Sequence, residues 1–505
     1  MTIVDVKLSF EELTKAQTYL QKLGLYDGQV DGIYGRLSEA AFVQFANALS
    51  IDSILDANSQ ALTNNLLQMP SVVRHLLQIL GEGDRIFSKF TNAQRIFVNM
   101  GQADSNYLGF LDRGVNGCIA GSMKGLPNRN FSPSPLLSHI PAYTDRLSSL
   151  PDGVNVVSYG EVAMLSNSQV RVRFRPYPAI GTIPNIETIG LEFLHSSIQE
   201  ACICIGSVVN GQMLTRWIGR NPLSNVQFWS STKILPLLYT IDTANQIQPN
   251  QEIANCVIAD SQGNKEPRTF AEMAQRICAY EESSGITSNS LSAMFKQFTT
   301  PTNLQDWLKR ITGNQKLIFQ GRYGEAPYIE QPILRDITGT NIINGVKDRH
   351  RGDNLISAYD LTRIVSQIAW HRHLAPVSRL TNAKWHSLST LISVMGQDTA
   401  RYLDAAIVGL GLSYFIDNPV VISKMGFGYS DQRKQTELTY TACIQFVDRL
   451  AKSHDLPLPK LRSVNMTLRA VLNLKDPVRE ALEIDARMAA TVADVLLRIV
   501  TEELI

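Results

Sequence analysis

Hydrophobic residues change their spacing along the chain, and these changes predict the order of helices and strands. FEELTKAQTYLQKLGLY, residues 10–26, has apolar positions three and four residues apart, the spacing of one helix face, and Gly24 ends the predicted helix. Glycines then mark a tight loop, and a second helical pattern begins near Ser38. We therefore treat residues 1–69 as a small helical domain.

Residues 196–505 alternate between strand and helix patterns. Two alternating apolar runs flank Asn210-Gly211, a dipeptide typical of a two-residue hairpin turn. NPVVISKMGFGYS and ELTYTACIQFVD predict further strands, whereas ISAYDLTRIVSQIAWHRHL and the terminal ALEIDARMAATVADVLLRIVTEEL predict helices. A hairpin, a helical middle and returning strands predict an α+β domain in which helices flank an antiparallel sheet.

Residues 70–195 lie between these segments and form a middle region of unclear role. SVVRHLLQILGEGDRIFSKF predicts a helix, and a loop rich in Pro, Ser and Asn follows it. QVRVRFRPY alternates and predicts a strand. Arg171, Arg173 and Arg175 fall on one face of this strand and the apolar residues on the other, so we expect the arginines to form a solvated edge.

Composition narrows the classes of function. The chain has 505 residues, of which 44% are hydrophobic and 18% charged, as expected for a soluble globular protein of two or three domains. Its formal net charge of +1 gives no electrostatic support for binding nucleic acid or an anionic membrane.

Cysteine and histidine usage argues against a metal site. The six cysteines are scattered without a CxxC pair, the eight histidines form no ligand pattern, and no phosphate-binding loop follows a strand, so no metal or cofactor is expected. Cys202 and Cys204 alternate in ACICIGSVV and should pack on the same face of a strand. The N-terminus lacks a signal-peptide pattern and no apolar run is long enough to span a bilayer, so the sequence predicts a cytoplasmic protein without a membrane span.

The candidate chemistry lies in FWSSTKILPLLYTI, where Ser230 and Lys233 are three residues apart at the head of an apolar run. On a helix these two side chains share a face. A serine hydroxyl becomes a nucleophile when a neighbouring base accepts its proton, and a buried lysine with a lowered pKa can be that base. The alternative is an ordinary helix start, with a serine cap and an exposed lysine.

The first domain resembles the peptidoglycan-binding repeat of bacterial cell-wall hydrolases. AQTYLQKLGLYDGQVDGIYGRLSEAAFVQFA, within residues 10–50, contains that family's leucine-rich helix, its D-G-x-Y-G core and its second helix with a phenylalanine. The resemblance implies peptidoglycan as a partner, with contacts from Tyr26, Asp31, Gly32 and Tyr34. The alternative is a helical hairpin that serves as a docking module without binding sugar.

The last 300 residues resemble the serine β-lactamase and penicillin-binding protein (D,D-peptidase) superfamily, as class A β-lactamases show it. That family carries S-x-x-K, S-D-N and K-T-G motifs in this order. Here SSTK follows a strand hairpin, GITSNSLSAMFKQF opens a helix and VVISKMGFGYS lies on a strand. RGDNLISAYDLTRIVSQI, residues 351–368, is similar to the family stretch that closes the active-site loop.

The resemblance implies a role for each matching residue. Ser230 is the acylated nucleophile and Lys233 its general base. The backbone N–H groups of Ser230 and Phe427, which follows Gly426, form the oxyanion hole. Lys424 lies opposite and holds protons and a substrate carboxylate in place.

The second motif departs from the family pattern. It can be Ser288-Asn289-Ser290, or Thr287-Ser288-Asn289 with threonine first. Either form supplies a hydroxyl that could relay a proton to the leaving group. The sequence does not choose between them, and Ser288 is our candidate.

The third motif and the deacylating acid also depart from the pattern. Met425 replaces the hydroxyl residue that binds the substrate carboxylate, and a thioether is at best a weak acceptor. The E-x-x-L-N motif of class A enzymes is absent; Glu325 or Glu330 is the candidate deacylating base, and the alternative, which the pattern favours, is a plain loop carboxylate.

The sequence thus predicts a serine hydrolase that forms an acyl-enzyme on a cell-wall peptide stem or a related amide or ester. One alternative is a catalytically degenerate relative that binds the wall or has a structural role. Another is a glutaminase-like amidase, because glutaminases share the fold and S-x-x-K. Contact with the wall would require delivery to the wall or periplasm by a non-classical route.

Overall fold

The computed structural model describes most of the chain from residue 134 onward and part of the first domain. The described residues are 10–22, 26–33, 35–38, 40–41, 134–149, 156–281, 283, 285–347, 350–409, 412, 416–449, 459–475 and 477–505. The helix predicted in SVVRHLLQILGEGDRIFSKF lies outside these residues, and so does Phe45, the phenylalanine of the second helix of the first domain.

A seven-stranded sheet forms the centre of the described chain. Its strands run in the order β13-β14-β15-β5-β6-β3, and β4 also pairs with β6. All pairs are antiparallel except β4 with β6. The bounds are β3 Arg175–Pro176, β4 Ile186–Glu187, β5 Ile198–Val209, β6 Gln212–Arg220, β13 Ile416–Ser430, β14 Gln435–Asp448 and β15 Lys460–Leu472.

The predicted hairpin forms where the sequence places it. Asn210 and Gly211 connect β5 to β6, and both have positive φ, 52° and 74°, as the common two-residue hairpin turn requires. Cys202 and Cys204 both pack into the same core on one face of β5. The structure adds β15, which the sequence patterns did not reveal, between β14 and β5.

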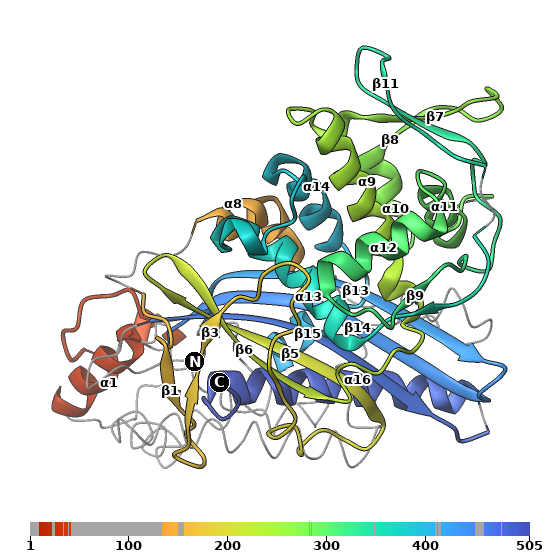
Figure 1. Cartoon of the computed structure of the whole chain (residues 1–505). Helices are drawn as coiled ribbons and strands as arrows, with labels where there is room; N and C mark the ends of the chain where they lie inside the picture. Colours follow the sequence, from red (N-terminus) through yellow and green to blue (C-terminus); the bar gives the residue numbers. More distant parts are fainter. Residues whose placement is uncertain are drawn as a thin grey trace.

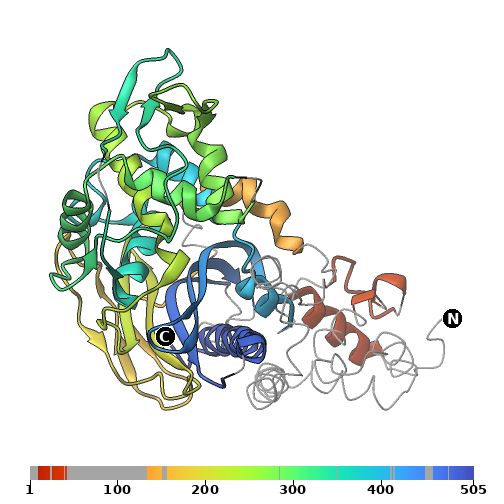
Figure 2. The same cartoon turned by 90° about the vertical axis from the view of Figure 1, so that its right-hand side faces the viewer.

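Helices cover both faces of the sheet (Figures 1 and 2). The long helix α16, Pro477–Val500, packs on β14 and β15 and closes one core. The second core lies between the sheet and the helical group, where α13 contacts β5, β14 and β15. The described chain is therefore α+β, a sheet between helical layers.

The helical group carries the elements that build the candidate site. Its α-helices are α9 Ile234–Ile247, α10 Phe270–Ala279, α11 Ser288–Lys296, α12 Pro301–Thr312, α13 Ala358–Ala369 and α14 Trp385–Met395. Helix α15, Tyr402–Gly409, instead packs against α16 and belongs to the core on that side of the sheet. Its 3₁₀ helices are η4 Trp229–Lys233, η5 Ile253–Asn255, η6 His371–His373 and η7 Pro376–Ser378. Short strands are β7 Val257–Asp260, β8 Arg268–Thr269, β9 Ile318–Phe319, β10 Pro332–Arg335, β11 Asn341–Asn344 and β12 Asn354–Leu355.

Residues before 196 also contribute to this part of the molecule. Strands β3 and β4 extend the sheet, and η3 Pro135–Ala142 and α8 Tyr143–Ser148 contact β13. The strand predicted in QVRVRFRPY is divided between β2, Arg171–Arg173, which pairs with β1, Val162–Met164, and β3. Val170 was expected on the buried face with Val172, but it is 52% exposed because it precedes β2.

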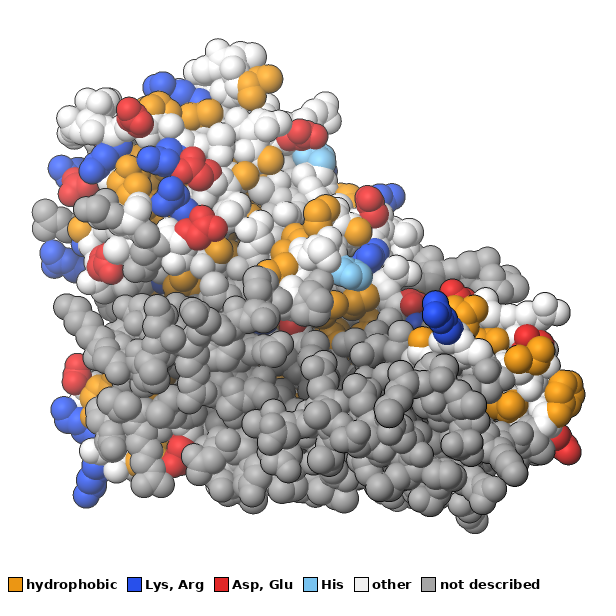
Figure 3. All heavy atoms as spheres, turned by 180° about the vertical axis from the view of Figure 1, so that it is seen from behind, with side chains coloured by type: hydrophobic (Ala, Val, Ile, Leu, Met, Phe, Trp, Pro, Cys, Tyr) orange, Lys and Arg blue, Asp and Glu red, His pale blue; other side chains and the backbone are white. Residues whose placement is uncertain are grey.

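The surface of the helical part carries both signs of charge. On the face opposite that of Figure 1, basic and acidic side chains are interspersed over the described atoms (Figure 3), in keeping with the net charge of +1. None of the helices in the described residues combines the length and apolarity of a membrane span.

Candidate active site

Ser230 and Lys233 lie on η4, a 3₁₀ helix, and not on the α-helix that the sequence suggested. A 3₁₀ helix has about three residues per turn, so side chains three apart stack directly above one another. Phe228 precedes η4 without a side-chain cap, so Ser230 is not the capping residue of an ordinary helix start. Lys233 is 1% exposed, which also contradicts the solvated lysine of that alternative.

Strands β13 and β14 hold η4 in place. The Ser231 hydroxyl donates to the Lys424 carbonyl at 2.9 Å and contacts the Thr439 hydroxyl at 2.8 Å. Gly426 allows this approach, because a Cβ there would lie 2.6 Å from the backbone nitrogen of Ser230. A side chain at position 426 would collide with η4, which explains sterically why the third motif has glycine there. The first and third motifs are thus in contact.

The second motif reaches Lys233 through Ser288. Lys233 Nζ donates to Ser288 Oγ at 2.8 Å. Thr287 is the cap of α11: its hydroxyl accepts the Ser290 N–H at 3.0 Å, and the Ser290 hydroxyl accepts the Thr287 N–H at 3.1 Å. Of the two forms left open by the sequence, the structure favours Ser288-Asn289-Ser290, since Ser288 meets the lysine and Thr287 has a capping role.

Lys424 lies on β13 with none of its side chain exposed. It forms an ion pair with Asp398, with 3.7 Å between Nζ and Oδ1. Asp398 also accepts the Met425 N–H at 3.0 Å and the Ser423 hydroxyl at 2.8 Å. Burial raises the pKa of Asp398, and the charge of Lys424 opposes that rise. Asp398 has no motif signal in the sequence and was missed.

Tyr280 lies between the two lysines. Its ring centroid is 3.6 Å from Lys424 Nζ and 5.7 Å from Lys233 Nζ, and its hydroxyl donates to the Met425 carbonyl at 2.8 Å. It ends α10 in the left-handed conformation, with φ of 53°. A cation over an aromatic face is stabilised electrostatically, so Tyr280 offsets part of the cost of burying two lysines. The sequence gives no signal for this role.

Ser230, Lys233, Tyr280, Ser288 and Met425 line a pocket of about 340 Å³, whereas Lys424 and Asp398 do not line it. Its lining residues are Gln227, Trp229, Ser230, Thr232, Lys233, Tyr280, Ser288, Asn289, Arg322, Tyr323, Gly324, Asn354, Met425 and Phe427. The lining includes the nucleophile and base candidates, Ser288, Asn289 and Phe427. Among these described lining residues none is acidic. The pocket is thus basic and hydroxyl-rich, a suitable environment for an anionic or developing oxyanion group.

Glu325 lies beside the pocket and is not among its lining residues. Its carboxylate accepts hydrogen bonds from the Thr287 hydroxyl and, at 3.0 Å, from the Asn289 side chain. It therefore ties the loop after Gly324 to the start of α11. Glu330, the other acid of this loop, is exposed and is also absent from the lining.

A buried lysine that the sequence did not reveal fixes the wall of the pocket. Lys296 Nζ donates to the Gly321 carbonyl and, at 3.0 Å, to the Asn354 side-chain oxygen. Asn354 in turn accepts the Gly321 N–H at 3.0 Å and donates to the Arg322 carbonyl at 3.1 Å. Burial lowers the pKa of Lys296 well below its usual value. The 321–324 loop is thereby held against the strand that contains Asn354.

The motif residues of the first domain form an internal network. In α1, Phe10–Lys22, buried Gln17 donates to the Tyr26 hydroxyl at 3.2 Å and to Asp31 at 3.0 Å, and accepts the Gly32 N–H at 2.8 Å. Gly32 has φ of 66°, a conformation that favours glycine. The roles of Tyr26, Asp31 and Gly32 in this network account for their presence in the motif, and their predicted contact with peptidoglycan stays a prediction. Tyr34 lies outside the described residues.

No protein-family model matches the chain, and no curated protein does. Seven chains of solved structures match it. One is PBP-A, with 12% sequence identity and a TM-score of 0.34, covering 62% of this chain and 99% of that chain. Another is a PBP-A mutant in an acyl-enzyme complex with penicillin G, with the same identity and TM-score, covering 60% of this chain and 91% of that chain.

Proposed function

We propose that the protein is a serine hydrolase that forms an acyl-enzyme on Ser230. The observation that carries the proposal is the Lys233–Ser288 hydrogen bond of 2.8 Å inside a pocket that Ser230 also lines. A hydroxyl and a buried amine from η4 and a second hydroxyl from α11 line one cavity. Such a group can both activate a nucleophile and deliver a proton to a leaving group.

The reaction proceeds by two proton transfers and one acyl transfer. Neutral Lys233 accepts the Ser230 proton while Ser230 Oγ bonds to the substrate carbonyl carbon. The lysine proton passes to Ser288 Oγ as the Ser288 proton moves to the leaving nitrogen or oxygen, whose bond to the carbonyl carbon breaks. Water then attacks the Ser230 ester, releases the acid and returns a proton to Ser230 Oγ. No additional reactant is consumed.

The oxyanion that forms on attack requires donors at the edge of β13. The N–H and C=O of Met425 bond to Asp398 and Tyr280, so the backbone of that residue points away from β14. Along an antiparallel strand, the backbone N–H and C=O groups of every second residue point to the same edge. The N–H of Phe427, two residues after Met425, therefore also points away from β14. Together with the Ser230 N–H it supplies two donors for the oxyanion.

For the substrate we propose an acyl group of a cell-wall peptide stem or a related amide or ester. Lys424 was expected to hold the substrate carboxylate, but it is fully buried, pairs with Asp398 and does not line the pocket, so it can act on a bound carboxylate only through its charge, whereas Asn289 lines the pocket. Met425 belongs to the core on the side of α16 and brings no hydroxyl to the pocket that it lines, so it does not replace the carboxylate-binding hydroxyl of the family pattern. The pocket volume of about 340 Å³ suits a short side chain or peptide end.

Covalent labelling tests the proposal. Wild type treated with a fluorophosphonate, and separately with a penicillin, should gain one adduct by intact-mass analysis. Ser230→Ala should gain none, and Ser261→Ala, which removes an exposed serine, should label like wild type. Failure of wild type to label while a control hydrolase labels would overturn the proposal. Hydrolysis of glutamine in preference to D-Ala-D-Ala peptides would support the glutaminase-like alternative.

A catalytically degenerate binding protein is the second candidate. The observation that favours it is the lack of an acid among the described residues that line the pocket, because an acyl-enzyme without a deacylating base turns over slowly. Binding of peptidoglycan fragments that is unchanged in Ser230→Ala, without any adduct in wild type, would support this reading.

A further inference from the structure

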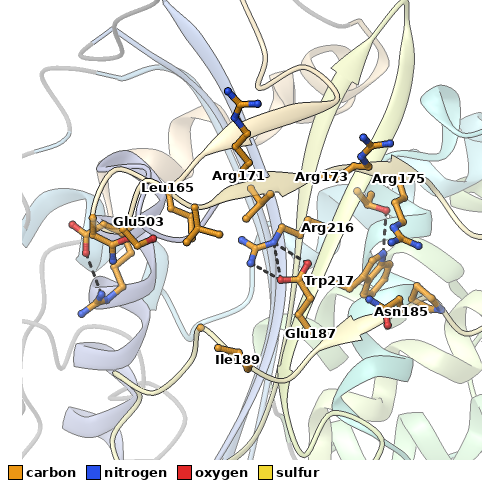
Figure 4. A pocket seen from close by; sticks show the side chains of 18 of the residues that line it. Leu165, Arg171, Arg173, Arg175, Asn185, Glu187, Ile189, Arg216, Trp217 and Glu503 are labelled. Carbon is orange, nitrogen blue, oxygen red and sulfur yellow. Dashed lines mark hydrogen bonds and ion pairs between the residues drawn. The ribbon is translucent and has the colours of Figure 1, made fainter.

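A second and larger pocket opens on another part of the sheet, at the β3 end. Its volume is about 900 Å³, near the upper limit for small-ligand sites. It is lined by the β2–β3 segment, by the segment between residues 184 and 193, by β6 and by the end of α16 (Figure 4). It shares no lining residue with the candidate active site.

Three arginines form one rim of this pocket. Arg171, Arg173 and Arg175 are exposed, while Val172 and Phe174 between them are buried in the core. Figure 4 shows all three on one extended segment, with the Arg171 and Arg173 side chains turned away from Glu187 and the Arg175 guanidinium turned toward Trp217. Alternate residues of an extended strand are roughly 6.6 Å apart, so the three side chains start from points spread over roughly 13 Å.

The acidic residues of the pocket are already engaged, whereas these arginines are not. Glu187 accepts two hydrogen bonds from Arg216 Nε, both 3.1 Å, and Glu503 pairs with Arg498 at 3.1 Å. Both carboxylate oxygens of Glu192 accept the Gly190 N–H, which lowers the pKa of Glu192. Within the described part of the chain, no ion pair or hydrogen bond joins the Arg171, Arg173 or Arg175 side chain to another residue. The rim therefore has uncompensated positive charge.

Another part of the lining is apolar and open to solvent. Ile189 is 77% exposed and Val170 is 52% exposed, and both line the pocket together with Phe193 and Trp217. The ligand that fits such a lining has anionic groups on one side and apolar groups on the other. A purely ionic polymer would leave these apolar side chains uncovered.

We propose that this pocket binds a short acidic peptide in an extended conformation, with carboxylates on alternate residues and apolar side chains between them. The spacing of the arginines matches that of side chains i, i+2 and i+4 in an extended peptide. A guanidinium binds a carboxylate through two parallel N–H donors, which favours arginine over lysine in such a site. The apolar residues of the peptide would cover Ile189 and Val170. The proposal does not depend on acylation of Ser230.

The test measures binding of a fluorescein-labelled peptide of alternating glutamate and leucine to the full chain by anisotropy at low salt. The combined variant Arg171→Gln, Arg173→Gln and Arg175→Gln should weaken binding at least about tenfold, since each exposed charge pair contributes modestly. The matched control removes three exposed arginines outside the pocket, Arg310, Arg351 and Arg372, and should bind like wild type. Circular dichroism verifies that both variants fold.

Each result bears on the proposal. Saturable binding that the rim variant loses and the control variant keeps supports it, as does weaker binding when glutamine replaces glutamate in the peptide. No saturable binding below about 1 mM, or equal loss in both variants, overturns it. Tight binding of tripolyphosphate or of phosphatidylglycerol vesicles without binding of the peptide also overturns it, and assigns the rim to phosphate or lipid instead.

Discussion

Lys233 and Ser288 are 55 residues apart in the chain and are joined by a hydrogen bond of 2.8 Å between Nζ and Oγ. One residue ends η4 and the other begins α11, so the bond fixes the relative position of two elements that contact the pocket from different sides. The same lysine lies one turn after Ser230. The proposed proton relay requires that this amine also reach the hydroxyl of Ser230, which lines the same pocket.

Replacing Lys233 by Met should abolish acylation while keeping the volume of the side chain. General base catalysis contributes about 10²- to 10⁴-fold, so we expect the rate of fluorophosphonate labelling to fall by at least about 10². Intact-mass time courses measure the rate. Lys316→Met, on an exposed lysine outside the pocket, should label at the wild-type rate. Unchanged labelling of Lys233→Met would remove the lysine from the mechanism.

Ser288→Ala and Thr287→Ala separate the relay from the helix cap. Ser288→Ala should slow acylation strongly, because it removes the hydroxyl that Lys233 contacts, and loss of this partner of a buried amine should cost about 1–3 kcal/mol of unfolding free energy. Thr287→Ala removes the cap of α11 and should cost about 1 kcal/mol of unfolding free energy. Urea denaturation and labelling rates together give the comparison. If Thr287→Ala lost acylation and Ser288→Ala kept it, the threonine-first form of the motif would be right.

Gly426→Ala should separate η4 from β13. The added Cβ would lie 2.6 Å from Ser230 N and 2.7 Å from Ser231 N, and both are backbone atoms that cannot rotate away. We expect a loss of roughly 1–3 kcal/mol in stability and loss of labelling, since the oxyanion donors move apart. Gly35→Ala is the control, because no atom lies within 4 Å of its Cβ position. A variant that labels normally would show that this contact does not position the site.

Lys296 predicts a dependence of stability on pH. Burial lowers its pKa in the folded state, so between that lowered pKa and the unfolded value of about 10.4 the unfolded chain binds more protons. Stability must then rise with pH across this window, by at most about 1.4 kcal/mol per pH unit from this one group. Urea denaturation of wild type and Lys296→Met at pH 7 and pH 9.5 measures the difference. The advantage of wild type over the variant should be larger at pH 9.5, and a constant difference would contradict the prediction.

The sequence predicted those elements around the site that turn residues and hydrophobic periodicity define locally. The hairpin at Asn210-Gly211, the strand that contains Lys424 and the terminal helix follow from turn residues and periodicity, and the described structure has all three. The conformation of η4 and the choice of Ser288 depend on packing between segments far apart in the chain.

The residues that support the site were not predictable for the same reason. Asp398, Tyr280 and Lys296 act through contacts with residues 25 or more positions away, and their local sequences have no distinctive spacing. Their roles depend on burial in the folded chain, and the residues adjacent in sequence do not show whether a single polar side chain will be buried. The arginines of the β2–β3 segment were expected at a solvated edge, and their exposure agrees with that, but the pocket beside them arises from four separate segments.

Glu325→Gln tests whether this carboxylate activates the deacylating water or only positions its neighbours. Its oxygens are bonded to Thr287 and Asn289 and it does not line the pocket, so we expect the lifetime of the acyl-enzyme to change less than about threefold. Loss of the charged acceptor should lower stability by about 1 kcal/mol. The lifetime is measured by intact mass after removal of excess penicillin, with Glu330→Gln as the control on the same loop. A Glu325→Gln adduct that persists at least about tenfold longer than that of wild type would assign Glu325 as the deacylating base.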